Sequence, residues 1–197
     1  IARRAGVVPL PGTGCLPADD EAALDALRAF GRENGYPLML KATAGGGGRG
    51  IRKVEREEDL ANQFRLARAE ARAAFNDTSL YAERSIESPR HVEVQILADG
   101  RGKVLHLGTR DCSIQRRHQK LIEIAPAILP PALTEAIQEA AVAVMKTAGY
   151  VSAGTVEFLV DPKTLNHWFM EVNTRLQVEH TVTEMLTGVD IVAEQIR

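Results

Sequence analysis

The sequence predicts an α+β fold built on a largely antiparallel sheet. Amphipathic helical patterns alternate with short apolar runs, and several of these runs are joined by connections short enough to form hairpins. Asp99-Gly100, between two such runs, is a strong hairpin signal. With 197 residues, 45% of them hydrophobic and 25% charged, the chain can form one sizeable core with room for a small lobe.

Helical patterns occur throughout the chain, and both ends look cut. Residues 1–5 read as the last turn of a helix, and the final DIVAEQIR reads as a helix without a stop signal. We therefore expect the chain to be a piece of a longer protein. Gly35 follows the end of the first full helix, and Thr181 and Glu184 have capping-box spacing. The expected helices span 19–34, 56–75 and 130–147, and a further helix begins at 181–186.

The expected strands are short runs of apolar or alternating residues. HVEVQIL alternates polar and apolar side chains, as in a strand with one wet face. Residues 37–84 have their own strand–loop–strand–helix–strand plan and are expected to form the small lobe. The expected strands cover 7–8, 37–42, 51–54, 80–85, 90–99, 103–109, 119–125, 154–161 and 167–173.

Two glutamates are expected to face each other on the last hairpin. If the connection centres on Thr164, Glu157 lies opposite Glu171, with Cβ atoms about 4.5–5.5 Å apart. The flanking residues are apolar, so both strands look buried, and buried like charges need a proton or a cation between them. Mg²⁺ or Mn²⁺ suits such oxygen ligands, and Asn173 can add another from the same face. The alternative is a pair of surface glutamates on a wet face.

A dense polar stretch, NTRLQVEH, follows this hairpin and favours the metal-site interpretation. Arg175, Gln177 and Glu179 alternate, so in an extended conformation they share one face. A guanidinium, an amide and a carboxylate together suit a small anion and a proton acceptor.

A glycine run at 45–48 lies between two expected strands in KATAGGGGRG. It is not a Walker A loop, because its lysine precedes the glycines, and it is not a Rossmann fingerprint, because a strand follows it. The glycines allow close backbone approach to an anion, and Lys41 can add a charge for a phosphate. The alternative is a mobile hairpin loop.

A basic run, DCSIQRRHQK, covers residues 111–120 and includes His118 and Lys120. The net charge is −2, and aromatic residues make up 5% of the chain with none in this run, which argues against a nucleic-acid surface. The run fits a multiply charged small ligand such as a nucleoside triphosphate, or a solvated loop. His91 is a further candidate, with a structural role as its alternative.

The sequence argues against a disulfide-rich, a zinc-binding and a membrane-spanning protein. Cys15 and Cys112 stand far apart without CxxC spacing, which argues against a disulfide framework or a structural zinc site and suits a reducing compartment. No apolar run approaches the ~20 residues that span a bilayer. We expect neither nucleic acid nor a membrane as a partner.

Taken together, these motifs resemble the biotin carboxylase component of the biotin-dependent carboxylases, within the ATP-grasp superfamily. The resemblance covers nearly the whole chain in the family's order, and RDCSIQRRHQK together with NTRLQVEH is highly specific for it. The other matching strings are YPLMLKATAGGGGRG, SPRHVEVQILADG, AGTVEFLV and MEVNTRLQVEHTVTEMLTGVD.

The resemblance implies a fragment of a larger biotin carboxylase with an ATP-grasp fold. Residues 1–36 would link a preceding lobe to the first full helix, 37–84 would form a glycine-loop lid, and 85–197 would form a catalytic subdomain truncated at its C-terminus. The implied reaction is ATP-dependent carboxylation of biotin by bicarbonate through carboxyphosphate, with Mg²⁺ or Mn²⁺. Implied partners are a biotin carboxyl carrier domain and a carboxyltransferase, in a homo-oligomer of the cytoplasm, or of the mitochondrion in a eukaryote.

The resemblance also implies roles for individual residues. Glu179 would deprotonate bicarbonate, Arg175 would contact bicarbonate and stabilise the enolate of biotin, and Lys120 would lie beside bicarbonate. The metal ligands would be Glu157, Glu171 and Asn173. The remaining contacts to nucleotide or bicarbonate would come from Lys41, Gly46, Gly47, Gly48, Glu83, Ile86, His91, Gln115, His118, Gln177 and Val178.

Three positions depart from the family's pattern. Ile124 follows Glu123 where the family usually has a second acidic residue, Thr181 replaces the usual proline, and Arg84 stands where lysine is common. Two alternatives stay open: another ATP-grasp ligase, such as a carbamoyl-phosphate synthetase-like domain, and a non-catalytic nucleotide-binding module. The intact charged residues named above argue against the second of these.

Overall fold

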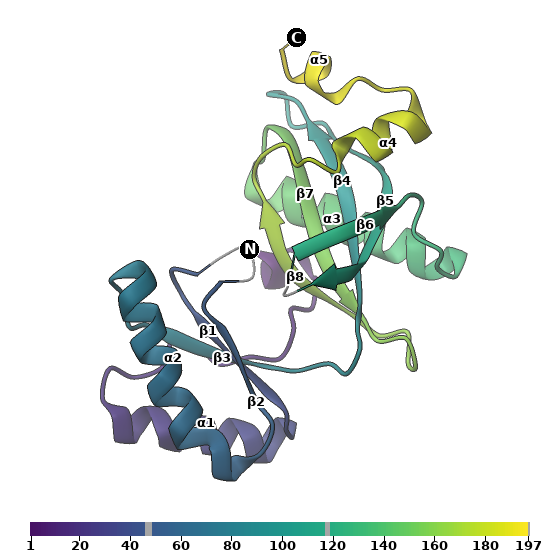
Figure 1. The fold of residues 1–197 in the computed structure, drawn as a ribbon. Coiled ribbons are helices and arrows are strands. Elements are labelled where there is room, and N and C mark those ends of the chain that lie inside the picture. Colours follow the sequence, from purple (N-terminus) through teal and green to yellow (C-terminus); the bar gives the residue numbers. More distant parts are fainter. Residues whose placement is uncertain (46–48, 117–118, 197) are drawn as a thin grey trace. The chain divides into compact units, whose positions relative to one another are not determined.

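The computed structural model describes residues 1–45, 49–116 and 119–196, and the chain divides into two compact units. Of these residues, the three-stranded unit comprises 10–45 and 49–86, and the five-stranded unit comprises 1–9, 87–116 and 120–196. Each has its own sheet (Figure 1). Each also has its own hydrophobic core. The expected α+β architecture with antiparallel pairing is confirmed.

The sheet of the three-stranded unit has the order β2-β1-β3, with antiparallel pairs. Leu38 and Leu40 alternate with the half-buried Met39 and Lys41 and are fully buried, together with Leu27 and Phe64 from the two helices. Both helices therefore cover the same face of this sheet. The elements are α1 (Asp20–Asn34), β1 (Leu38–Ala42), β2 (Ile51–Val54), η2 (Glu57–Asp59), α2 (Leu60–Phe75) and β3 (Leu80–Arg84).

Helix α1 begins and ends as its sequence predicts. The Asp19 carboxylate accepts a hydrogen bond from the Ala22 amide at 2.8 Å, which satisfies one of the unpaired N–H groups of the first turn. Gly35 ends the helix with φ of 78°, a value that glycine adopts without strain. Because α1 contributes to the same core as β1, this unit begins before residue 37.

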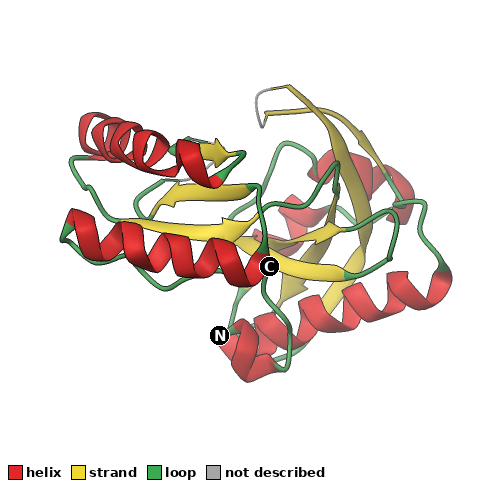
Figure 2. Ribbon diagram, turned by 90° about the horizontal axis from the view of Figure 1, so that it is seen from below, coloured by secondary structure: helices red, strands yellow, loops and turns green. Residues whose placement is uncertain are grey.

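The sheet of the five-stranded unit has the order β6-β5-β4-β7-β8. Helix α3 packs on one face of it, and short helices precede and follow the sheet in the chain (Figure 2 shows helices in red and strands in yellow). The elements are η1 (Ala2–Ala5), β4 (Arg90–Ala98), β5 (Val104–Arg116), β6 (Gln119–Ile124), α3 (Pro131–Ala148), β7 (Ser152–Val160), β8 (His167–Asn173), α4 (His180–Thr187) and α5 (Ile191–Ile196).

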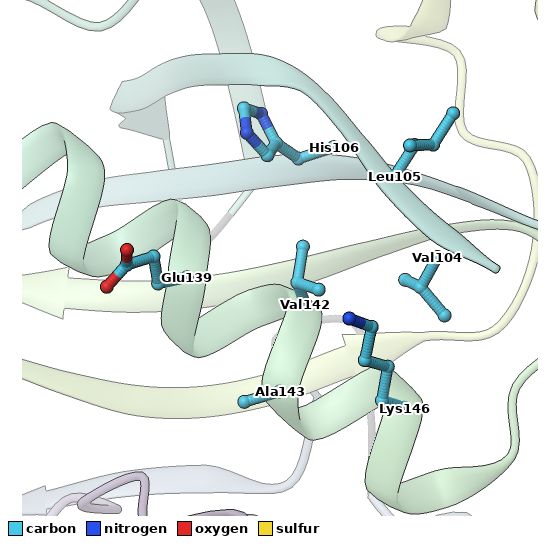
Figure 3. A pocket seen from close by; sticks show the side chains of 7 residues that line it. All are labelled: Val104, Leu105, His106, Glu139, Val142, Ala143 and Lys146. Carbon is cyan, nitrogen blue, oxygen red and sulfur yellow. The ribbon is translucent and has the colours of Figure 1, made fainter.

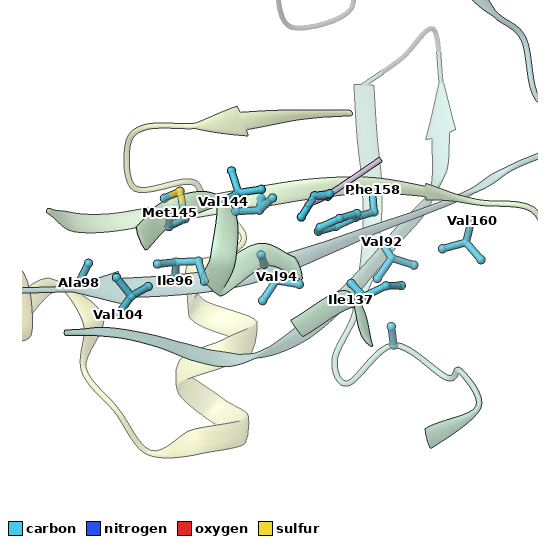
Figure 4. Packing of buried hydrophobic residues seen from close by; sticks show 14 residues of the cluster. Val92, Val94, Ile96, Ala98, Val104, Ile137, Val144, Met145, Phe158 and Val160 are labelled. Atoms are coloured by element: carbon cyan, nitrogen blue, oxygen red, sulfur yellow. The ribbon is translucent and has the colours of Figure 1, made fainter. Parts of the chain in front are cut away.

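Alternation along β4 sends two sets of side chains to opposite faces of this sheet. Val92, Val94 and Ile96 are fully buried and pack with α3 residues such as Ile137 and Met145 (Figure 4). The intervening residues of β4 face away from α3. They belong to the side of the sheet on which the charged residues meet.

That second face is not wet, contrary to the prediction for HVEVQIL. Glu93 is fully buried and Gln95 is 1% exposed. The reason is a buried arginine, Arg110 on β5, which hydrogen-bonds to both side chains. Alternation of polar and apolar residues indicated the strand correctly, but it did not reveal that the polar side was covered.

Two local predictions were also wrong. The expected strand at residues 7–8 is reduced to one isolated bridge, Pro9 with Phe169. The expected capping box is absent because α4 begins one residue earlier, which places Thr181 inside the helix. The Glu184 carboxylate instead accepts a hydrogen bond from the Ile191 amide, 2.8 Å away at the start of α5.

Candidate active site

Four charged residues form a row across four adjacent strands of the five-stranded unit. Arg110 on β5 pairs in register with Glu93 on β4, Glu93 pairs with Glu157 on β7, and Glu157 pairs with Glu171 on β8. The predicted opposition of Glu157 and Glu171 is therefore confirmed. Directly opposed residues share a face of the sheet, so three carboxylates and one guanidinium are brought side by side.

The two facing glutamates differ in burial. Glu157 is 3% exposed, whereas Glu171 lies on the edge strand β8 and is exposed, so the expectation that both were buried was wrong. The pairing also shifts just beyond them, since Phe158 pairs with Phe169 and leaves Met170 as an extra residue. Met170 is thus the extra residue of a bulge beside Glu171.

The Glu157 carboxylate has partners on both oxygens. Oε1 accepts hydrogen bonds from Lys120 Nζ at 2.9 Å and from Asn173 Nδ2 at 2.8 Å, with Gln177 Nε2 at 3.4 Å. Oε2 lies 2.7 Å from His91 Nε2. Four of the predicted site residues therefore converge on this one carboxylate.

The orientation of His91 follows from its second neighbour. Gln115 Nε2 lies 2.7 Å from His91 Nδ1 and 2.7 Å from the Cys112 carbonyl oxygen, so this amide group donates to both. His91 Nδ1 is then an acceptor, and in the neutral ring the proton is on Nε2, which donates to Glu157.

These contacts keep Glu157 and Lys120 ionised. Burial raises the pKa of the Glu157 carboxyl, but the hydrogen bonds from His91 and Lys120 and the positive charge of Lys120 outweigh it and lower the pKa to about 2. Burial lowers the pKa of the Lys120 ammonium, but Glu93 and Glu157 outweigh this effect and raise it above its ordinary value. Both charges are therefore present at neutral pH.

Glu179 completes the cluster beside Lys120. Its Oε1 lies 3.8 Å from Lys120 Nζ, and its side chain is 15% exposed. Burial and the negative charges of Glu179 and Glu93 raise the pKa of the neighbouring Glu123 carboxyl. A carboxylate that is accessible and close to a fixed cation can accept a proton from an anion held by that cation.

The loop after β8 departs from the extended path that was predicted. Glu179 has helical backbone angles at the N-cap of α4, because a turn forms at residues 178–179. Gln177 is buried within the cluster, but Arg175 is exposed and donates to the Leu176 carbonyl oxygen at 3.1 Å. Val178 is 87% exposed. The predicted common face of Arg175, Gln177 and Glu179 was therefore wrong.

Three further predicted residues belong to the three-stranded unit. Lys41 Nζ lies 2.5 Å from Glu83 Oε2, and both side chains are largely covered, on the sheet face opposite α1 and α2. Ile86 is half-buried. Gly46, Gly47, Gly48 and His118 lie outside the described residues.

The sequence did not lead us to predict two members of the cluster, Glu93 and Arg110. Glu93 Oε1 accepts from Arg110 Nε at 2.5 Å, and Glu93 Oε2 accepts from Lys120 Nζ at 2.5 Å. A signal was available, because Glu93 occupies a central position of an alternating strand flanked by His91 and Gln95, two other polar residues. Because the alternation was interpreted as a solvent-exposed face, Glu93 was not predicted to be a buried residue of the site.

The residues present fit a divalent cation by the chemistry of their donors. One ligand atom from each of His91, Glu93 and Glu157 lies within 4.8 Å of the others. Glu157 is an ionised carboxylate, and a hard metal ion prefers such charged oxygen donors. Its contact with the Lys120 ammonium shows that this carboxylate can already balance a positive charge. Asn173 donates a hydrogen bond to the Glu157 carboxylate, and Glu171 lies opposite Glu157 in the sheet. The two other predicted metal ligands are therefore neighbours of Glu157.

A hollow of about 450 Å³ lies elsewhere, between the start of β5 and α3 (Figure 3). Its lining includes His106, Glu139 and Lys146, and it includes none of the predicted site residues.

Among the residues that the structure describes, none of the helices is long and apolar enough to cross a membrane.

Comparison with known proteins agrees with the motif-based resemblance. Residues 2–197 match the family model described as "Carbamoyl-phosphate synthase L chain, ATP binding domain". The chain is 51% identical to pyruvate carboxylase of Bacillus subtilis over 196 residues, which cover 99% of this chain and 17% of that protein.

Two solved structures are similar along the whole chain. The biotin carboxylase–β,γ-ATP complex from Campylobacter jejuni has a TM-score of 0.92 and 51% identity, covering 99% of this chain and 43% of that one. The biotin carboxylase domain dimer of Hydrogenobacter thermophilus 2-oxoglutarate carboxylase, in complex with MgADP, ADP and bicarbonate, has a TM-score of 0.91 and 51% identity, covering 100% and 42%.

The chain spans less than half the length of each of these three proteins. The fold predicted from the resemblance, a mixed helix and sheet ATP-grasp fragment, is confirmed by the two structural matches. The chain therefore belongs to the family of the carbamoyl-phosphate synthase L chain ATP-binding domain, and the proteins it resembles within that family are biotin carboxylases and the corresponding domains of larger carboxylases.

Proposed function

We propose that the protein containing this chain carries out the biotin carboxylase half-reaction, in which bicarbonate and ATP carboxylate biotin on a carrier protein. The observation that carries the proposal is the cluster around Lys120. Its ammonium contacts the ionised Glu157 carboxylate at 2.9 Å and lies 3.8 Å from the carboxylate of Glu179. A fixed cation thus separates an anionic donor suited to a metal from a carboxylate suited to act as a base.

The first chemical step assigned to these residues is removal of the bicarbonate proton. Bicarbonate is a poor nucleophile until that proton is lost, and Glu179 is the carboxylate that would take it. Lys120 and Gln177 would hold the anion by charge and hydrogen bonding, with Val178 and Arg175 beside it. Holding both groups in position converts a bimolecular proton transfer into an effectively unimolecular one.

The second step is phosphoryl transfer. An oxygen of the deprotonated bicarbonate forms a bond to the γ-phosphorus of ATP while the bond to the bridging oxygen breaks, giving ADP and carboxyphosphate. When bound, Mg²⁺ or Mn²⁺ would offset the charge of the phosphate oxygens. Glu157, Glu171 and Asn173 would hold that ion, and the contact between Glu157 and Asn173 supports this set.

The remaining residues are assigned to the nucleotide. Lys41, with the backbone of Gly46, Gly47 and Gly48, would contact phosphates, and Glu83 and Ile86 would border the adenine. His91, Gln115 and His118 would line the nucleotide site. Support for nucleotide and bicarbonate as substrates comes from the two similar structures, one a β,γ-ATP complex and the other a complex with MgADP and bicarbonate.

The last step transfers carbon to biotin. Carboxyphosphate breaks its carbon–oxygen bond to release CO₂ and phosphate. The released phosphate takes the proton from the ring nitrogen of biotin, and that nitrogen then forms a bond to the carbon of CO₂. Arg175 would stabilise the enolate form of biotin, and its exposed position leaves it accessible to a second protein. The proposed partners are a biotin carboxyl carrier domain and a carboxyltransferase, in a homo-oligomer of the cytoplasm or the mitochondrion.

The decisive measurement is bicarbonate-dependent ATP hydrolysis by the full-length protein, with and without free biotin. Stimulation of hydrolysis by biotin is expected. ATP binding without stimulation by biotin would contradict the proposal, and failure to bind ATP would favour a non-catalytic module.

A second candidate function is carbamoyl phosphate synthesis, because the family description names that enzyme. It also begins by phosphorylating bicarbonate, so the two functions differ in the acceptor that reacts after carboxyphosphate has formed. The presence of RRHQK and RLQVEH together favours biotin. Formation of carbamoyl phosphate from ammonia, without an effect of biotin, would favour the second candidate.

The assignment of the base is tested by Glu179→Gln. This substitution keeps the size and hydrogen-bonding capacity of the side chain but removes its ability to take a proton. We expect ATP binding within about twofold of the unsubstituted protein and loss of bicarbonate-dependent turnover by at least about 100-fold. Glu135→Gln, on the exposed surface of α3, is the matched control. Unchanged turnover in Glu179→Gln would refute the assignment.

A further inference from the structure

Among the described residues, Arg110 has the largest side chain that is fully buried. It projects from β5 and reaches acceptors on four other segments: β4, β7, the loop after β8, and α4. Those acceptors are Glu93 Oε1 (2.5 Å from Nε), Gln95 Oε1 (2.8 Å from Nη1), Thr183 Oγ1 (2.7 Å from Nη1), Thr155 Oγ1 (3.4 Å from Nη2) and Gln177 Oε1 (3.5 Å from Nη2).

This arrangement gives one acceptor to each of the five N–H groups of the guanidinium. Arginine offers five donors in a fixed planar fork, so its partners must be arranged around that plane. Removing such a charge from water is costly, and well-packed apolar residues often stabilise a core equally well. Stability alone therefore does not account for a buried arginine here, whereas fixing the geometry of its partners does.

The first partner that Arg110 fixes is Glu93. One oxygen of this fully buried carboxylate accepts from Arg110 and the other accepts from Lys120 Nζ at 2.5 Å. The guanidinium thus sets the plane of the Glu93 carboxylate, and that carboxylate sets the position of the Lys120 ammonium. Lys120 in turn lies 3.8 Å from Glu179.

The second set of partners flanks Glu179 in the chain. Gln177 lies two residues before it and Thr183 four residues after it, and both are buried at 7% and 1% exposure. Both accept from Arg110, at 3.5 Å and 2.7 Å. The turn that carries Glu179 into α4 is therefore attached to the sheet on both sides through the same guanidinium.

We infer that Arg110 is a positioning residue of the bicarbonate site. Through Glu93 it places the ammonium of Lys120, and through Gln177 and Thr183 it places the loop that carries the proposed base. This inference rests on the proposed function, because it assigns Lys120 and Glu179 to bicarbonate. Arg110 itself touches no substrate in this scheme, and its role is to hold two groups of the site at a fixed separation.

Substitution of Arg110 by lysine in the full-length protein tests the inference. Lysine keeps the positive charge that Glu93 needs but cannot supply five donors in one plane. We expect the KM for bicarbonate to rise by about 10-fold to 100-fold, by analogy with the effect of replacing the outer partners of metal-binding residues. Binding of ATP, measured directly by calorimetry, should change by less than about twofold.

The matched control is Arg90→Lys. Arg90 lies on β4 and pairs with Asp111 of β5 at 2.5 Å, so it joins the same two strands. It alternates with Glu93 and therefore belongs to the α3 side of the sheet. The KM for bicarbonate in this variant should match that of the unsubstituted protein.

A second pair of variants separates positioning from a general loss of stability. Thr183→Val removes one acceptor while leaving the Arg110–Glu93 ion pair in place, and Thr183→Ser keeps the hydroxyl. We expect a raised KM for bicarbonate in Thr183→Val and a value close to that of the unsubstituted protein in Thr183→Ser. Thermal unfolding measured on all variants shows how far each substitution affects folding.

The possible failures are distinguishable. If the unsubstituted protein lacks bicarbonate-dependent hydrolysis, the proposed function fails and this inference fails with it. If that activity is present and both Arg110→Lys and Thr183→Val retain an unchanged KM for bicarbonate, only the inference is overturned. A fall in melting temperature with an unchanged KM would likewise show that Arg110 serves stability alone.

Discussion

Glu157 shows how strongly one buried residue can depend on its neighbours. Its carboxylate is nearly inaccessible, and it stays ionised because His91 and Lys120 outweigh the cost of burial. The sequence predicted its position opposite Glu171 from hairpin spacing alone. It could not predict His91 or Lys120 as partners, because both come from strands whose pairing with β7 is non-local or indirect.

The lowered pKa of Glu157 makes a prediction about stability and pH. A carboxyl group whose pKa falls on folding, here from 4.5 to about 2, stabilises the native state fully above about pH 4.5, and this contribution is lost as the pH falls toward 2. The free energy of unfolding by urea should therefore drop less between pH 5 and pH 3 in Glu157→Gln than in the unsubstituted protein. Glu135→Gln, which changes an exposed carboxyl, should leave that drop unchanged.

Equal drops in Glu157→Gln and the unsubstituted protein would contradict the stated cause of the shift. Other lowered carboxyls, such as Asp111, contribute to the drop in all three proteins and so cancel in the comparison. The comparison therefore isolates the contribution of one group.

At the scale of the elements, the sequence predicted existence better than environment. The strand predicted at 167–173 agrees with β8 at His167–Asn173, because this run is rich in aromatic and apolar residues that favour a strand. The wet face assigned to β4 was wrong because a strand pattern does not say what packs on its polar side. Only the pairing of β4 with β5 brings Arg110 over Glu93.

Helix ends were predictable where the cap is local. Asp19 and Gly35 bound α1 as expected, since each acts on residues within one turn. The box proposed for α4 failed because the start of that helix depends on the turn at residues 178–179, which the buried Gln177 helps to set. Long-range burial thus overrode a local motif.

The Asp19 cap can be tested directly. Asp19→Ala leaves the Ala22 amide without its side-chain acceptor, so the free energy of unfolding should fall by about 1 kcal/mol. Asp19→Ser retains a hydroxyl acceptor and should stay within a few tenths of a kcal/mol of the unsubstituted protein. Equal values for alanine and serine would show that the cap contributes nothing, and chemical denaturation measures both.

At the scale of the whole molecule, the chain consists of two units with separate cores. Leu27 belongs to the core of the three-stranded unit, and Ile137 belongs to that of the five-stranded unit. The sequence predicted the small lobe from the plan of residues 37–84, but it did not predict that α1 shares its core. The apolar face of α1 indicated burial without showing the surface it would meet.

Separate cores predict separate responses to substitution. Leu27→Ala and Ile137→Ala each remove a fully buried side chain and should cost about 2–5 kcal/mol in the unit concerned. Amide hydrogen exchange should show loss of protection in β1 and β3 for Leu27→Ala, and in β4 and β7 for Ile137→Ala. Equal loss of protection in both units from either substitution would show that they unfold as one.

The buried charges of the five-stranded unit also carry an evolutionary consequence. Glu93 has Arg110 on one oxygen and Lys120 on the other, so the loss of one member leaves a charge in the core without its counterpart. Substitutions at these positions should therefore be inherited together. In related proteins that have lost the proposed activity, we expect Glu93 and Arg110 to be replaced together by apolar residues of similar combined volume.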